Sequence, residues 1–222
     1  MNKGLAPIVD TTKRERLVME TILLFLYRVP AMVVAVTLHE YVKAAASWRL
    51  GDNNPKLDKR ITLNPLRHID LVGALCIIFF TFGWGKPVST SPMFYANRRK
   101  ATWIVYGLPS VVNLVVGFIF GISAFLIGFA PMPEMVLNVV VGVVYQLAVV
   151  NMAMFLFNII PIYPLSGAKI FSLYLNAEAR VRMARYERWF QLFLVMFIIL
   201  GFAEMMFMPI ITATLDFTVV GL

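Results

Sequence analysis

The residues best suited to chemistry are His39 and Glu40, which lie in the otherwise apolar stretch Val36–Ala44. They begin the helical pattern H-E-x-x-H, in which two histidines one turn apart hold a zinc ion and the glutamate activates a metal-bound water. The position of the second histidine holds Lys43, a cation without a free lone pair for a metal. The stretch therefore has the frame of a zinc site in which one ligand is replaced by a positive charge.

The composition predicts an integral membrane protein. Of the 222 residues, 60% are hydrophobic and only 14% are charged, whereas soluble domains have about 25% charged residues. The net charge of +8 indicates cytoplasmic loops and contact with anionic membrane lipid. We expect no nucleic-acid partner, because no arginine-rich tail or aromatic-basic interleaving is present. The single cysteine, Cys76, allows no intrachain disulfide and is expected to be a small apolar packing residue.

The chain reads as one transmembrane domain over residues 1–222. The predicted fold class is an all-α membrane protein, a polytopic transmembrane helix bundle with short membrane-associated β-strands. Arg28 and Pro30 predict a kink or a break in the first long helix. The predicted parts are a polar tail at 1–16, the motif helix at 17–47, a re-entrant and strand region at 49–101, and spans at 102–130, 136–160 and 189–214.

The apolar run at 71–82 is about a dozen residues long, short of the ~20 that a spanning helix needs. It is better interpreted as a re-entrant or interfacial element. If it is re-entrant, the tail lies outside the cell; if it spans, the tail lies inside. We favour the re-entrant case. The positive-inside rule then places the basic segments 43–70, 85–101 and 163–188 in the cytoplasm and the segment 131–137, which lacks Lys and Arg, outside. The expected location is a bacterial-type cytoplasmic membrane, crossed several times.

Six motifs, in order, cover most of the chain from about residue 36 to residue 170. They are His39–Tyr41, Arg49–Asp52, Ile61–Asp70, Phe82–Val88, Gly107–Pro109 followed by Asn113, and Phe157–Gly167. With these motifs the chain resembles the site-2 protease family of intramembrane zinc metalloproteases, in its compact prokaryotic form. Each motif alone is weak, but their shared order in an apolar chain of this length predicts the fold of that family.

The resemblance implies a zinc site enclosed by transmembrane helices. Two histidines of H-E-x-x-H and the aspartate of a later L-D-G motif hold the metal, and the glutamate is the general base. Water reaches the site from one side, and a transmembrane segment of the substrate is cleaved after local unwinding. Strands within 55–88 would hold the substrate by strand addition. Asn113 would lie near the active site and contact substrate; its structural alternative is a hydrogen bond to a neighbouring helix.

Two of the three implied zinc ligands are substituted in this chain. Lys43 stands at the second histidine, Ser166 stands at the aspartate of L-D-G, and only His39 is retained. A catalytic zinc needs three protein ligands, so no cofactor is expected. The sequence therefore predicts a catalytically impaired or inactive homologue that binds transmembrane segments or membrane partners. We expect Lys43 to replace the lost zinc charge beside Glu40, with Ser166 and His39 hydrogen-bonded around this pair.

Two other functions stay open. The first is an active intramembrane zinc metalloprotease with an atypical ligand set, which would recruit His68 with Asp70 or Asp52. The second is a metal-independent Ser-Lys hydrolase that uses Ser166 and Lys43. The carboxylate of Glu40 opposes the second function because it favours the protonated lysine, and no oxyanion hole is visible in the sequence.

Overall fold

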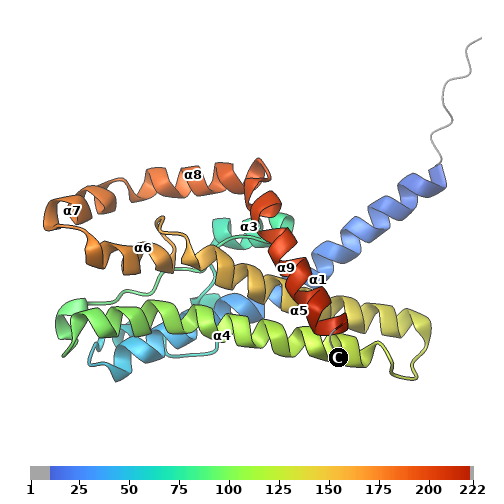
Figure 1. Cartoon of the computed structure of the whole chain (residues 1–222), viewed down its shortest axis with the longest axis horizontal. Helices are drawn as coiled ribbons and strands as arrows, with labels where there is room; N and C mark the ends of the chain where they lie inside the picture. Colours follow the sequence, from blue (N-terminus) through green and yellow to red (C-terminus); the bar gives the residue numbers. More distant parts are fainter. Residues whose placement is uncertain (1–10, 221–222) are drawn as a thin grey trace, which may run out of the picture.

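In a computed structural model, which describes residues 11–220, three long helices form the body of the protein (Figure 1). They are α1 (Thr11–Arg49), α4 (Arg98–Ile127) and α5 (Glu134–Ile159). The most extensive helix packing is between α4 and α5, and α1 packs against both. Each contains a segment long and apolar enough to cross a membrane, as expected of an all-α membrane protein.

The motif helix begins earlier than predicted. Residues 1–10 of the predicted polar tail lie outside the described residues, but α1 already begins at Thr11. Pro30 lies inside this continuous helix and does not break it. The side chain of Arg28 contacts a neighbouring helix, because its Nη1 donates hydrogen bonds to the backbone oxygens of Ile78 (3.2 Å) and Phe79 (3.0 Å). These are carbonyls that a helix end leaves without partners, so Arg28 fixes the end of a short helix against α1.

That short helix is α3 (Leu71–Phe80), the apolar element predicted to be re-entrant or interfacial. Asp70 caps the N-terminus of α3, since its Oδ1 accepts a hydrogen bond from the Gly73 backbone N–H at 2.9 Å. At the other end, Thr81 adopts a left-handed conformation with φ of 72°.

The end of α1 and the start of α4 lie at the same end of the molecule (Figure 1).

The expected short strands do not form among residues 11–220. The segment between α1 and α4 holds α2 (Asn54–Leu57), η1 (Pro65–Arg67), α3 and η2 (Pro92–Phe94). Its β-structure is one isolated antiparallel bridge between Ile69 and Gly85. A side chain takes the place of a pairing strand here: Arg60 donates to the backbone oxygens of Lys86 (2.6 Å) and Pro87 (3.0 Å).

After α5 the chain forms a second layer of shorter helices. These are α6 (Ser166–Phe171), η3 (Ser172–Tyr174), α7 (Ala177–Arg185), α8 (Glu187–Ile199) and α9 (Phe202–Val220). The predicted span at 189–214 consists of two helices, because α8 and α9 meet at a bend of 65°. Gly201 has a φ of +78° at this bend, a conformation that ends helices and that glycine adopts at little cost.

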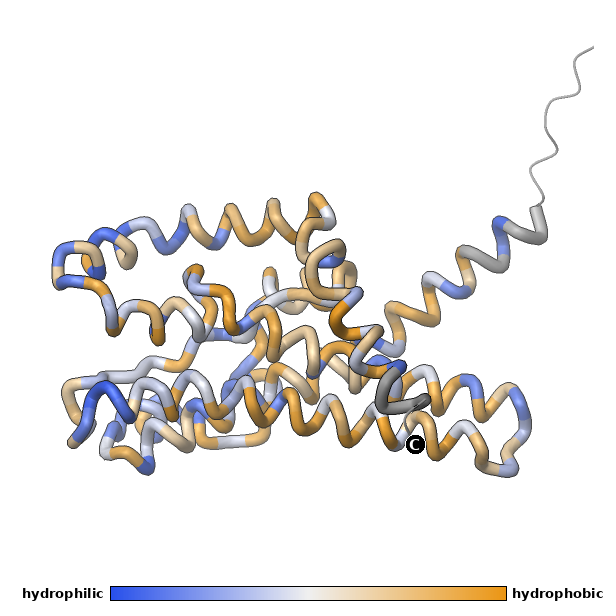
Figure 2. The backbone as a smooth tube through the Cα atoms, in the orientation of Figure 1, coloured by the Kyte–Doolittle hydropathy of each residue, from blue (hydrophilic) through white to orange (hydrophobic). Residues whose placement is uncertain are grey.

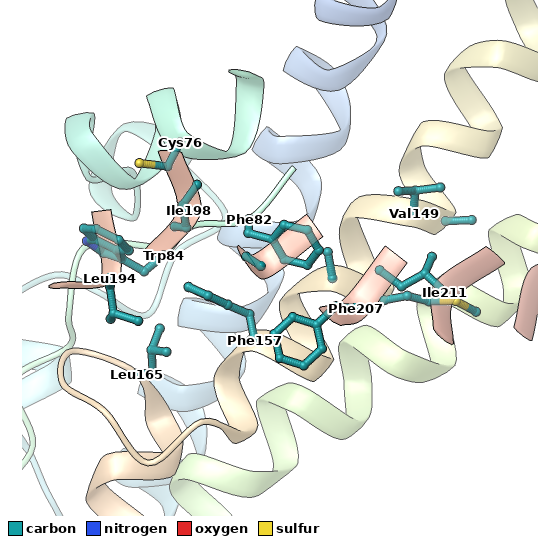
Figure 3. Packing of buried hydrophobic residues seen from close by; sticks show 14 of the residues in the cluster. Cys76, Phe82, Trp84, Val149, Phe157, Leu165, Leu194, Ile198, Phe207 and Ile211 are labelled. Atoms are coloured by element: carbon teal, nitrogen blue, oxygen red, sulfur yellow. The ribbon is translucent and has the colours of Figure 1, made fainter. Parts of the chain in front are cut away.

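A hydrophobic core joins the two layers (Figure 3). Phe82, which follows α3, packs between Phe157 of α5 and Phe207 of α9, with ring centroids 5.9 Å and 5.7 Å apart. Trp84 and Leu165 belong to the same buried cluster. Burial of these large side chains holds the segments at 82–85 and 162–166 against α1 and α5, where the polar site lies.

Candidate functional site

The residues singled out in the sequence come together in one buried polar site among α1, α4, α5 and α6. The least exposed are His39 and Asn113, both at 0%, and the others are almost equally buried: Glu40 at 3%, Lys43 at 5% and Ser166 at 1%. Polar groups buried to this degree need partners, since an unpaired one is costly. The partners that each side chain has therefore define what the site can do.

Glu40 and Lys43 form a direct ion pair. Lys43 Nζ lies 2.8 Å from Glu40 Oε1, and the three-residue spacing places both side chains on one face of α1. The ring of Tyr106 on α4 also faces the ammonium, with its centroid 6.0 Å from Nζ. The carboxylate of Glu40, which would act as the general base in a metal site, is thus paired with the ammonium of Lys43.

The His39 ring is held on both sides. Its Nδ1 lies 2.8 Å from Asn113 Oδ1. The Asn113 amide nitrogen donates to the Ala35 backbone oxygen (3.2 Å) and to Asn151 Oδ1 (2.9 Å). Because these bonds fix the orientation of the amide, Oδ1 must accept from His39 and the proton belongs to Nδ1. The other ring nitrogen, Nε2, is then the acceptor for the hydroxyl of Ser166, 3.3 Å away.

Ser166 is positioned by α5. It is the first residue of α6, and its backbone N–H donates to Asn158 Oδ1 at 3.3 Å. Asn158 is itself fixed by a bond from its amide nitrogen to the Met154 backbone oxygen at 3.0 Å. Among the described hydrogen bonds, Ser166 pairs with His39 and Asn158 while Lys43 pairs with Glu40. A Ser166–Lys43 contact, which a Ser-Lys hydrolase would require, is not among them.

Arg60 and Gly85 close the site over Glu40, and neither role was predicted from the sequence. Arg60 Nη2 lies 4.0 Å from Glu40 Oε2. Burial lowers the pKa of the Arg60 guanidinium, and the charge of Glu40 opposes that shift. A Cβ added to Gly85 would lie 2.8 Å from Glu40 Cγ and 2.9 Å from Val36 Cγ1, so only glycine allows this loop to pass so close to α1.

Asn151 is a further site residue that was not predicted from the sequence. It lies on α5 and completes the contact from α1 through Asn113. A signal was available: Asn151 and Asn158 are polar residues seven apart in an apolar span, which places both on one helix face.

The donor set does not fit a zinc ion. Zinc needs three protein ligands in a catalytic site, and no group of three or more His, Cys, Asp or Glu side chains capable of holding a metal occurs in the part of the chain that the structure describes. Of the three positions that the resemblance implies as ligands, only His39 has a suitable donor atom, and Lys43 and Arg60 place two positive charges beside Glu40. We therefore derive no reaction step through a metal.

The residues of the atypical ligand set, His68, Asp52 and Asp70, form hydrogen bonds elsewhere in the structure. His68 Nε2 lies 2.7 Å from the Thr62 backbone oxygen and donates to it. Asp52 accepts from Ser47 Oγ (2.9 Å) and from the Ser91 backbone N–H (2.7 Å). Asp70 begins α3, as described above. His68 and Asp70 thus fix local backbone, whereas Asp52 joins the end of α1 to the loop at Ser91.

We expect stability to fall on mild acidification because of His68. Burial lowers the pKa of His68 from its ordinary 6.5, and the bond to Thr62 only partly opposes this. The unfolded chain therefore binds a proton more readily than the folded chain does. Stability is full above about pH 7.5 and falls as the pH drops through about 6.5 towards the lower folded-state pKa.

Thermal melting in detergent from about pH 8 to about pH 5.5 measures this effect, since few other groups titrate there. The chain has two histidines, so His68→Gln removes the contribution of His68 to the pH dependence and leaves that of His39. The variant keeps a donor for Thr62 and should show a weaker pH dependence than the unmodified protein. Equal pH dependence in both would contradict the assignment to His68.

Fold and site together define a helical membrane protein with a buried polar centre of metalloprotease-like layout. A protein of Bacillus subtilis (strain 168) with the name "Putative zinc metalloprotease YwhC" is 31% identical to the chain over 176 residues, which are 78% of this chain and 80% of the relative. The chain belongs to the same metalloprotease family as this relative. No family model matches the chain, and no solved structure matches it.

Proposed function

We propose that the chain is a site-2-protease-like member of this family that has lost its catalytic zinc and binds transmembrane segments or membrane partners without cutting them. It crosses a bacterial-type cytoplasmic membrane several times, with α3 as a re-entrant element. The basic loops beside α1 and α4 face the cytoplasm, in accord with the positive-inside rule.

One observation carries this proposal: Lys43 Nζ is bound to Glu40 Oε1 at 2.8 Å, where a metal-dependent enzyme needs a metal-bound water beside its base. A protonated lysine in this place both repels a dication and neutralises the carboxylate. The hydrogen bond of Ser166 to His39 adds support, since a neutral hydroxyl has replaced the third, anionic ligand. The six sequence motifs support the site-2-protease-like scaffold.

The competing proposal, an active zinc enzyme with an atypical ligand set, has less support. It needs His68 to turn towards Asp52 or Asp70, and each of these side chains already has a hydrogen-bond partner. Breaking those bonds would leave buried polar groups without partners.

Zinc content tests the proposal. The purified chain is incubated with zinc in detergent, desalted and submitted to elemental analysis beside a peptidase assay on an apolar helical peptide. We expect far less than one zinc per chain and an uncut peptide that stays bound. Stoichiometric zinc, or cleavage that a chelator abolishes, would overturn the proposal.

A further inference from the structure

An apolar cavity lies beside the polar site and shares Tyr106 and Asn158 with it. It has a volume of about 400 Å³ and is bounded by α4, the end of α5, α6 and η3. This volume is within the range of ligand pockets, roughly 300–1,000 Å³. The wall from the later helices is apolar and is formed by Phe155, Ile159, Pro161, Ile170 and Phe171. Tyr106 and Asn158 separate the cavity from Lys43 and Ser166.

The wall from α4 is formed by Trp103, Tyr106, Gly107, Ser110 and Val111. Three of them, Trp103, Gly107 and Val111, follow one another at intervals of four residues and form a stripe, and Arg99 precedes them by one more such interval. Residues four apart lie on one helix face, about 6 Å further along the axis at each step. The stripe therefore begins with a cation at the end of α4 and continues as an apolar surface towards the middle of the helix.

The mouth of the cavity is cationic and aromatic. The Arg99 guanidinium lies over the ring of Tyr174, 5.2 Å from its centroid, and Tyr174 and Trp103 are 58% and 47% exposed. Arg98 and Lys100 are also exposed beside it. No acidic side chain is among the described residues that line the cavity. Figure 2 shows the change from this hydrophilic end of α4 to its hydrophobic middle. Exposed Trp and Tyr near basic residues are typical of the membrane interface.

Gly107 leaves room in the middle of the stripe. A Cβ added there would meet one atom, Ile170 Cδ1, at a distance of 4.0 Å. The absence of a side chain at this position opens the cavity between α4 and α6, whereas Gly85 is needed because a loop passes close by. A larger residue at 107 would occupy the cavity and displace whatever it holds.

We propose that this cavity is a binding site for one anionic phospholipid, with an acyl chain beside Gly107 and the phosphate at Arg99. The charge pattern favours this occupant. A cationic, aromatic mouth followed by an apolar cavity matches an amphiphile with an anionic head, and the exposed Arg98, Arg99 and Lys100 attract anionic lipid to this end of α4. Arginine binds phosphate through paired N–H groups. The site is independent of any metal and of the proposed loss of proteolysis.

The test is lipid retention measured by native mass spectrometry. The full chain in detergent is titrated with phosphatidylglycerol or phosphatidylcholine of identical acyl chains. We expect retention of one phosphatidylglycerol in clear preference to phosphatidylcholine. Gly107→Leu should reduce this retention several-fold by filling the cavity, and Arg99→Gln should abolish the preference for the anionic head.

Two matched variants serve as controls. Val115→Leu adds bulk on an exposed part of α4 that does not line the cavity, and Arg185→Gln removes an exposed charge on α7. Both should keep the phosphatidylglycerol. Equal retention of the two lipids by the unmodified chain, or full retention by Gly107→Leu, would overturn the proposal. So would crosslinking of a Gly107→Cys variant to a second protein chain in place of lipid, since the occupant would then be a protein.

Discussion

Changing Lys43 to His and Ser166 to Asp in the same chain is expected to create a site that binds about one zinc ion per molecule. The new His would stand four residues from His39 on α1, one helical turn away, as the H-E-x-x-H pattern requires. The new Asp would stand where Ser166 now meets the same ring. Loss of the lysine also frees Glu40 and removes the cation that repels the metal.

Two distances support this expectation. Ligand atoms about 2.0–2.1 Å from a tetrahedral zinc are roughly 3.3–3.5 Å apart, and His39 Nε2 lies 3.3 Å from Ser166 Oγ. The proton on His39 Nδ1 is directed at Asn113 Oδ1, 2.8 Å away. Metal-binding histidines usually have such a partner, and it leaves Nε2 free to coordinate. The ring of His39 therefore has an orientation that suits a zinc ligand, and the side chain at position 166 lies next to its Nε2.

Elemental analysis after zinc loading and desalting measures the result. The single variants Lys43→His and Ser166→Asp should retain much less zinc than the double variant, because each lacks one ligand. Adding His39→Ala to the double variant should abolish binding again. A double variant that melts like the unmodified protein but retains no zinc would show that the scaffold has lost more than two ligands.

Changing Lys43 to Met while keeping Glu40 is expected to destabilise the protein strongly. Removing one partner of a buried ion pair leaves an uncompensated charge, at a cost of about 3–5 kcal/mol. Glu40 is 3% exposed, and its remaining cationic neighbour, Arg60, lies 4.0 Å away. The carboxylate would be left with a distant partner that is already bonded to two backbone oxygens.

Thermal melting in detergent, with the double variant Glu40→Gln/Lys43→Met, tests this expectation. The double variant should be more stable than Lys43→Met alone, because it carries no unpaired charge. The chain also offers a matched control in Glu178 and Arg182, paired at 3.0 Å but 81% and 64% exposed. Arg182→Met should cost about 0–1 kcal/mol. A Lys43→Met variant that melts like Arg182→Met would contradict a structural pair at the site.

The sequence predicted the long helices and the membrane class because both depend on local composition. Runs of apolar residues longer than about 20 define spans without knowledge of their neighbours, and α4 and α5 match the predicted spans closely. The expectation that Lys43 lies near Glu40 also needed only the helical spacing. The bend at Gly201 could not be located in this way, because a glycine in an apolar run is tolerated in a helix as often as it ends one.

The parts that sequence reasoning missed depend on contacts between distant segments. Arg60 lies within 55–88, where strands are expected, and its bonds to the backbone at 86–87 exist only once that loop folds over α1. For Asn113 the sequence leaves open substrate contact or a hydrogen bond to a neighbouring helix. The structure shows hydrogen bonds to α1 and α5, and His39 could not be predicted as the partner. No local pattern encodes either partner. The proposed loss of catalysis and the partners of the protein stay predictions.

The ion pair within α1 also bears on how the protein enters the membrane. Both charges belong to one helix and lie three residues apart, so they can neutralise each other before any other helix has arrived. A zinc site would instead leave its ligands exposed to lipid until α6 was made and the metal had been supplied. We therefore expect insertion of α1 into the bilayer to depend neither on later synthesis nor on metal delivery.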